Sequence, residues 1–98
     1  MPLDWDAVRR RYEEDPAVST HGGRPLRVTR VDAQQLEVRS SMWTKTLERA
    51  HLERAVELMD RHELSRRVKD FVPAYGEQVT KERRTLAAIV LEDLDQLH

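Results

Sequence analysis

Cysteine is absent from this 98-residue chain, and neither sign of charge dominates it. Without cysteine there is no disulfide framework, no thiolate zinc site and no cysteine nucleophile. The 17 Lys+Arg nearly balance the 18 Asp+Glu, which disfavours both a globally basic nucleic-acid binder and an acidic disordered tail. No apolar run approaches the roughly 18 residues of a membrane span, and no charged-then-apolar leader opens the chain. We therefore expect a soluble cytoplasmic protein with no membrane contact.

What the sequence has in abundance is charge, at 36% of its residues. Its basic residues are 14 Arg and only 3 Lys, a ratio that indicates a GC-rich genome. No internal repeat, low-complexity run or linker divides the chain. Because domains usually span roughly 50–200 residues, a single domain over 1–98 is predicted.

An N-terminal helix is predicted within residues 1–15. It begins at Asp4, whose carboxylate can accept a hydrogen bond from the amides of the first turn. Trp5, Val8 and Tyr12 then recur at i, i+3 and i+7, so they share one face, which we expect to be buried. Residues 16–25 contain two prolines and the Gly22-Gly23 pair, and this composition predicts a loop.

After Pro25 the hydrophobic period changes to two, which predicts a β-hairpin with Leu26, Val28, Leu36 and Val38 on its buried face. Strict alternation would place Arg30 on that apolar face, so a bulge or a strong twist is expected near the hairpin tip. Because an isolated two-stranded hairpin is marginal in water, residues 43–47 are a candidate third strand. The sheet is thus predicted to have two or three antiparallel strands.

Two helices are predicted after the sheet. Leu52, Ala55, Val56 and Met59 form an apolar stripe at helical spacing, which predicts a helix over 48–62. A shorter helix is expected over 65–72, with Ser65 as its N-cap and Pro73 as its stop. Residues 74–78 are then expected to form a loop.

A last helix is predicted from its N-cap Thr80 towards Leu97. Its apolar face is wide enough to contact two elements or a second subunit. The resulting fold class is α+β: an N-terminal helix, a two- or three-stranded antiparallel hairpin sheet, and three helices, with the hairpin and these helices filling 26–98.

Metal and catalytic motifs are missing from the pattern. His51 and His62 would lie about 16 Å apart along a helix at about 1.5 Å per residue, whereas zinc ligands lie within about 2.1 Å of the metal. No serine stands in a Gly-x-Ser-x-Gly elbow. Glu92, Asp93 and Asp95 are expected to be surface charges. We therefore predict that the protein is not an enzyme and has no metal, no cofactor and no small-molecule substrate.

The uneven distribution of charge along the chain is the sequence feature that most suggests a function. Residues 61–84 contain seven basic and four acidic residues, a net charge of +3. A short helix, a connection and a helix opening at Thr80 would be compatible with a helix-turn-helix, in which the recognition helix presents its N-terminal residues to base edges. However, the connection 72–79 is long for the usual three- or four-residue turn. The candidate nucleic-acid-binding residues are Arg61, Arg66, Arg67, Lys69, Lys81, Arg83 and Arg84.

Two alternatives to nucleic-acid binding remain open from the sequence. The basic residues can simply be a solvated surface whose charges pair along the helices. The protein can also be an interaction module or a homodimer, joined through Met42, Trp43 or the wide face of the last helix. The first alternative assigns no function, and the second predicts a protein partner.

The order of elements resembles a known kind of module. The segments that carry the resemblance are LRVTRVD at 26–32, LEVRSS at 36–41, LERAVEL at 52–58 and RTLAAIV at 84–90. Together they are similar to small hairpin-then-helix modules that occur as accessory parts of bacterial restriction and defence proteins. The resemblance covers about residues 24–97 and carries no catalytic residue over. It implies an accessory role.

Overall fold

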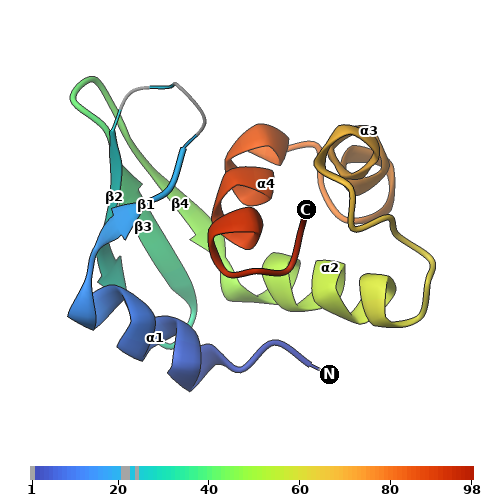
Figure 1. Ribbon diagram of the computed structural model, residues 1–98, viewed down its shortest axis with the longest axis horizontal. Coiled ribbons are helices and arrows are strands. Elements are labelled where there is room, and N and C mark those ends of the chain that lie inside the picture. The colour runs from blue at the N-terminus through green and yellow to red at the C-terminus, as the bar shows by residue number, and fades with distance from the viewer. Residues whose placement is uncertain (1, 21–22, 24) are drawn as a thin grey trace.

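The computed structural model describes residues 2–20, 23 and 25–98. Within these residues, helix α1 (Trp5–Glu14) precedes a four-stranded antiparallel sheet, and three helices follow it (Figure 1). The strands are β1 (Ala17–Val18), β2 (Leu26–Val31), β3 (Gln35–Arg39) and β4 (Thr44–Glu48), and they lie in this order across the sheet. The helices are α2 (Arg49–Asp60), α3 (Val68–Gln78) and α4 (Arg84–Asp93). The predicted α+β class is confirmed, and the sheet has four strands where two or three were expected.

Helix α1 begins and packs as its sequence predicts. The Asp4 carboxylate accepts a hydrogen bond from the amide of Ala7 at 3.2 Å, and Trp5, Val8 and Tyr12 are buried. The indole Nε1 of Trp5 donates to the backbone carbonyl of Asp32 at 2.7 Å. This bond ties the first turn of the helix to the β2–β3 turn.

The hairpin β2–β3 contains the expected bulge. Val28 pairs with Val38, but the next pair is Arg30 with Glu37, so Thr29 is an extra residue on β2. A bulge of one residue reverses the alternation beyond it. Arg30 therefore lies on the outer face, and Val31 returns to the side of the core.

Strand β1 was missed, because residues 16–25 were predicted to be a loop throughout. Val18 is buried and pairs with Leu26, and the amide of Val28 donates to the carbonyl of Pro16 at 2.8 Å. A strand of two residues is too short to show a period of two, so no hydrophobic pattern predicts it. His21 and Gly22 lie outside the described residues.

Helix α2 buries the predicted stripe, and all four of its residues (Leu52, Ala55, Val56 and Met59) are in the core. It ends at Asp60, because His62 adopts a left-handed φ of 61° that an α-helix cannot continue through. The predicted end at His62 is therefore two residues too late.

The predictions for the next helix were wrong at both ends. Helix α3 starts at Val68, and it runs through Pro73 to Gln78. Proline has no amide hydrogen to donate to the carbonyl of Lys69, four residues earlier. Lys69 and Pro73 are both exposed, so this carbonyl is on the solvent side of the helix. Phe71 and Tyr75 are buried with their ring centroids 5.2 Å apart, so packing outweighs the local preference of proline.

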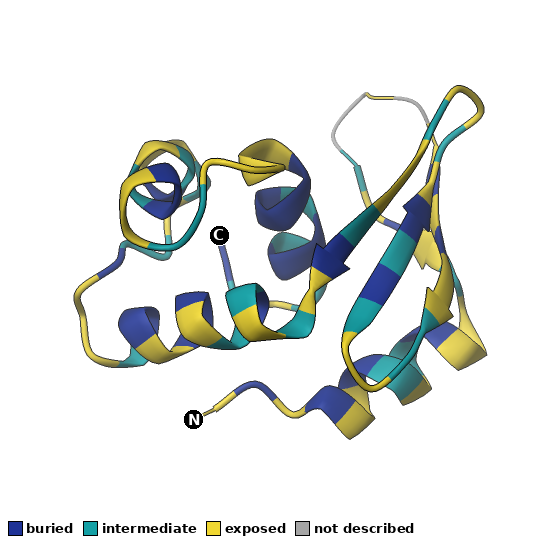
Figure 2. Cartoon of the chain, turned by 180° about the vertical axis from the view of Figure 1, so that it is seen from behind, coloured by how far each residue is buried: buried dark blue, intermediate teal, exposed yellow. Residues whose placement is uncertain are grey.

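Helix α4 is the central helix of the fold. It lies between the sheet and α3, and half of its ten residues are buried (Figure 2). It starts at Arg84 rather than at Thr80, whose hydroxyl accepts from the amide of Glu82 at 3.2 Å and stabilises the preceding turn. It ends at Asp93, and the chain then turns back so that Leu97 enters the core. The predicted helix from Thr80 towards Leu97 was therefore too long at both ends.

Tyr75 makes the stability of the fold sensitive to alkaline pH. Burial, and less strongly the negative charge of Glu48, raise the pKa of Tyr75 from 10.0 to about 12. In the unfolded chain the phenol ionises near pH 10, so its contribution to stability is complete below pH 10 and is lost as the pH rises towards 12. We expect Tyr75→Phe to reduce the slope of stability against pH in this window by up to about 1.4 kcal/mol per pH unit. Urea unfolding at several pH values measures this slope, and equal slopes for the wild type and Tyr75→Phe would contradict the prediction.

Candidate functional site

The seven predicted basic residues do not form one cluster, and two of them are engaged within the fold. Arg61 Nη2 lies 3.0 Å from Glu57 Oε1, and Arg66 Nη2 lies 2.6 Å from Asp60 Oδ1. Arg66 also donates through Nη1 to the backbone carbonyl of Gln96 at 3.2 Å. Arg66 therefore fastens the C-terminal segment to the end of α2, which is a structural role.

The other five lie in two groups at opposite ends of α3. Arg67 and Lys69 are at its start, and their exposed side chains form no ion pair with a described residue. Lys81, Arg83 and Arg84 follow its end. The two groups are separated by the length of the helix, about 16 Å for 11 residues.

Within the second group, Arg84 is held by its close contact with α3. A Cβ atom on the buried Gly76 would lie only 2.5 Å from Arg84 Cδ, so the stem of Arg84 passes directly over the glycine. Arg83 has a left-handed φ of 53°, and its guanidinium lies 3.9 Å from the Glu82 carboxylate. Lys81 is exposed and forms no ion pair with a described residue.

A helix-turn-helix interpretation does not agree with the burial of α4. In that motif the second helix enters the major groove and must expose one face along its length. Of the residues of α4, only Arg84 and Thr85 are fully exposed. The wide apolar face of α4 is packed inside the molecule, so it does not offer a free surface to a second subunit.

Asp93 is not the surface charge that the sequence predicted. Its side chain is 1% exposed, and it accepts hydrogen bonds from the hydroxyl of Tyr12 at 2.7 Å, the amide of Ser19 at 2.9 Å and Arg11 Nη2 at 3.3 Å. Burial, followed by the hydrogen bond to Asp93 and its charge, raises the pKa of Tyr12 above its ordinary value. The carboxylate thus connects α1, the residue after β1 and the end of α4.

The sequence reasoning also missed a second group of arginines, on the outer face of the sheet. Arg27 on β2 and Arg39 on β3 are directly opposite each other, and both are exposed. The alternation of the strands had placed both at outward positions. That they face each other follows from the register between β2 and β3, which the alternation of apolar and polar residues does not determine.

No group of three or more His, Cys, Asp or Glu side chains among the described residues is arranged to hold a metal ion. No helix in that part of the chain has both the length and the hydropathy to cross a membrane.

No family model, curated protein or solved structure matches the chain. The comparisons therefore assign no family. The similarity to accessory modules of restriction and defence proteins stays an expectation based on short segments.

Proposed function

We propose that the protein is a non-enzymatic binder of nucleic acid, and that it contacts phosphates through the basic residues around α3. The observation that carries the proposal is the difference between engaged and free cations. Arg61 and Arg66 have acidic partners, at 3.0 and 2.6 Å, whereas four of the other five predicted residues are exposed and have no ion pair with a described residue. These four residues are Arg67, Lys69, Lys81 and Arg84.

The position of these cations supports contact with the backbone rather than with base edges. Arg67 and Lys69 stand at the positive end of the α3 dipole, where their charge is unfavourable unless an anion is nearby. Phosphate contacts position a protein on nucleic acid but carry no sequence information. The proposal is therefore binding with little sequence preference, in the cytoplasm.

The salt dependence of binding tests this proposal. Four phosphate contacts on duplex DNA give a slope of log K against log salt of about −4, at about −0.9 per phosphate. The double variant Arg67→Ala/Lys69→Ala should flatten the slope by about 2. Fluorescence anisotropy with a labelled duplex between about 50 and 200 mM salt measures both slopes.

The matched control is Arg54→Ala/Arg61→Ala, which removes the same charge from two residues that both pair with Glu57. It should change the slope by less than 1. No binding at about 50 mM salt, or equal effects of the two double variants, would refute the proposal.

Met42 favours a second candidate function, in which the protein binds another protein. This residue is 73% exposed at the β3–β4 turn and is the one large hydrophobic side chain exposed in the described part. Trp43 follows it, half-buried beneath Lys45, whose Nζ lies 4.8 Å from the ring centroid. This candidate ranks second because single exposed apolar residues are common. It predicts a solution mass above 11.5 kDa that Met42→Ser lowers.

A further inference from the structure

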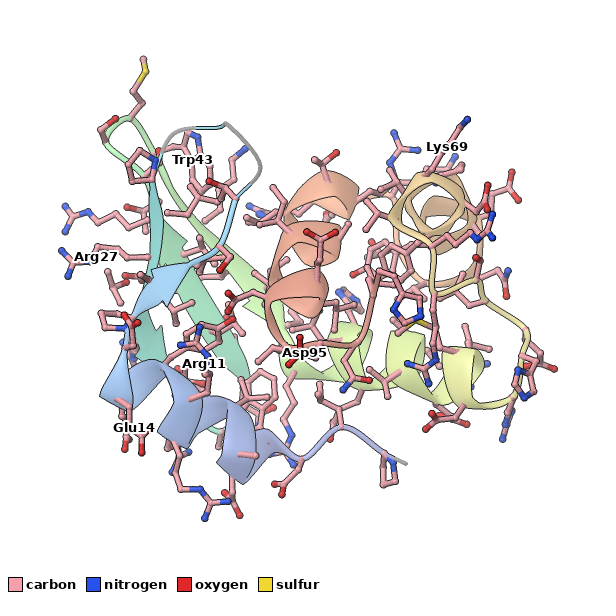
Figure 3. All side chains as sticks on the ribbon, viewed as in Figure 1. Arg11, Glu14, Arg27, Trp43, Lys69 and Asp95 are labelled. Carbon is pink, nitrogen blue, oxygen red and sulfur yellow. The ribbon has the colours of Figure 1, made fainter. Side chains whose placement is uncertain are left out.

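The outer face of the sheet carries an unbalanced pair of arginines. Arg27 and Arg39 are Cα partners across β2 and β3, and neither side chain bonds to a described residue. Figure 3 shows Arg27 pointing away from the helices, at the end of the molecule opposite Lys69. Like charges directly opposite each other destabilise a sheet. The pair is therefore unfavourable until something negative lies against it.

Three acidic side chains of the neighbouring segments make other contacts. The Glu37 carboxylate accepts from the hydroxyl of Thr29 at 2.8 Å. Asp32 pairs with Arg30 at 3.4 Å and accepts from two amides of the β2–β3 turn. Asp15 accepts from the amide of Ala17 at 3.1 Å. No carboxylate within the described ranges thus forms an ion pair with Arg27 or Arg39.

An open hollow lies in front of this pair. Its volume is about 760 Å³, and the polar residues that line it are Arg27, Arg39, Ser40, Ser41 and Asp15. Ser40 Oγ accepts from the amides of Met42 and Trp43 at 3.1 Å, so its hydroxyl hydrogen is still available to a ligand. Two guanidinium groups and two hydroxyls make this a donor-rich surface.

A second hollow, of about 360 Å³, adjoins the first and shares Arg27 with it. Arg9 and Arg30 also line this groove between α1 and β2, together with one acidic residue, Glu13, so three basic residues stand against one acid. Arg9 Nε is buried and has no hydrogen-bond partner. Buried donors are nearly always satisfied, so an unpartnered one beside a basic groove is an independent sign of a missing acceptor.

We infer that the outer sheet face binds a phosphate group between Arg27 and Arg39, with room for a linked second phosphate near Arg9. The planar guanidinium fork matches phosphate oxygens in bidentate geometry, and two forks on adjacent strands can hold one phosphate from both sides. The phosphate can belong to a small phosphorylated molecule or to a nucleic-acid strand. The site does not depend on the proposed function, because the residues around α3 take no part in it.

Titration with inorganic phosphate and pyrophosphate, followed by calorimetry at low salt, tests the site. Pyrophosphate should bind more tightly than phosphate. Arg27→Gln and Arg39→Gln should each weaken binding about tenfold. Arg10→Gln makes the same charge change at an exposed position on α1 and should leave affinity within about twofold. Failure of both anions to bind, or equal losses in all three variants, would overturn the inference.

Arg39→Glu gives a readout that a misfolded variant cannot imitate. It replaces the repulsion of the pair by an attraction, so the melting temperature of the free protein should rise by about 1–6 °C. The same variant should no longer bind pyrophosphate. A melting temperature at or below that of the wild type, or retained binding, would count against the site.

A single-stranded oligonucleotide separates the two sources of phosphate. If Arg27→Gln weakens its binding and Arg67→Ala/Lys69→Ala does not, the site takes a nucleic-acid strand. If pyrophosphate binds and the oligonucleotide does not compete with it, the site takes a small phosphorylated molecule. If duplex binding fails while pyrophosphate binding persists, the function proposed above is wrong and this site stands.

Discussion

Trp5→Ala is expected to lower the free energy of unfolding by about 3–5 kcal/mol, the range for removing a large aromatic side chain from a core. The indole is 3% exposed. Its ring lies 5.5 Å from the Arg49 guanidinium, and its Nε1 bonds to the Asp32 carbonyl. The substitution removes the packing and the hydrogen bond together. Since small domains have a total stability of about 5–15 kcal/mol, this is a large fraction of it.

Urea unfolding measures the effect, and the variant retains Trp43 as a fluorescent reporter. Trp5→Phe is the matched variant, because it keeps an aromatic ring and loses the bond to Asp32; it should cost about 1–2 kcal/mol. A loss below about 1 kcal/mol for Trp5→Ala would show that α1 is only loosely attached to the sheet.

Asp93→Asn should cost about 2–4 kcal/mol, although it changes a single oxygen into an amide nitrogen. Every group that faces the carboxylate is a donor: the Tyr12 hydroxyl, the Ser19 amide and the Arg11 guanidinium. An asparagine offers one acceptor oxygen and an NH₂ group, so a donor must face a donor. Arg11 is 36% exposed, which limits the loss because water can solvate it.

Asp95→Asn provides the control for this prediction. It removes the same charge two residues away, from an exposed side chain. The backbone of Asp95 has a left-handed φ of 61°, which asparagine adopts readily. We expect a change within about 0.5 kcal/mol. Equal losses for the two variants, measured by chemical denaturation, would mean that net charge rather than the buried hydrogen bonds decides stability here.

The elements predicted correctly are those with local signals. The Asp4 cap and the stripe of α1 lie within a few residues of each other. The broken alternation that indicated a bulge or a strong twist near the hairpin tip is equally local, and the structure has the bulge at Thr29. Helix α3 was misplaced because the rule for Pro73 is also local, whereas Phe71 and Tyr75 are buried by contacts with the rest of the fold. Tertiary packing overrode the local preference.

The candidate site also combines features with a local signal in the sequence and features that only the folded chain produces. Composition identified the basic residues of 61–84, but only the folded chain pairs Arg66 with Asp60 and with Gln96, which is 30 residues away. Asp93 has partners 74 to 82 residues earlier in the chain, so no window of the sequence could reveal its burial. Arg27 and Arg39 were visible as outward residues, and their opposition depends on register.

The order of the strands has a consequence for how the chain folds. Each strand pairs with its neighbour in the sequence, and β4 leads directly into α2, so most of the sheet forms by closing short loops. Short loops close with little loss of entropy, and folds rich in local contacts fold rapidly. The bonds of Asp93 are different, since they join the two ends of the chain and close its longest loop. We therefore expect the bonds between Asp93 and the N-terminal segment to form late in folding and chiefly to slow unfolding.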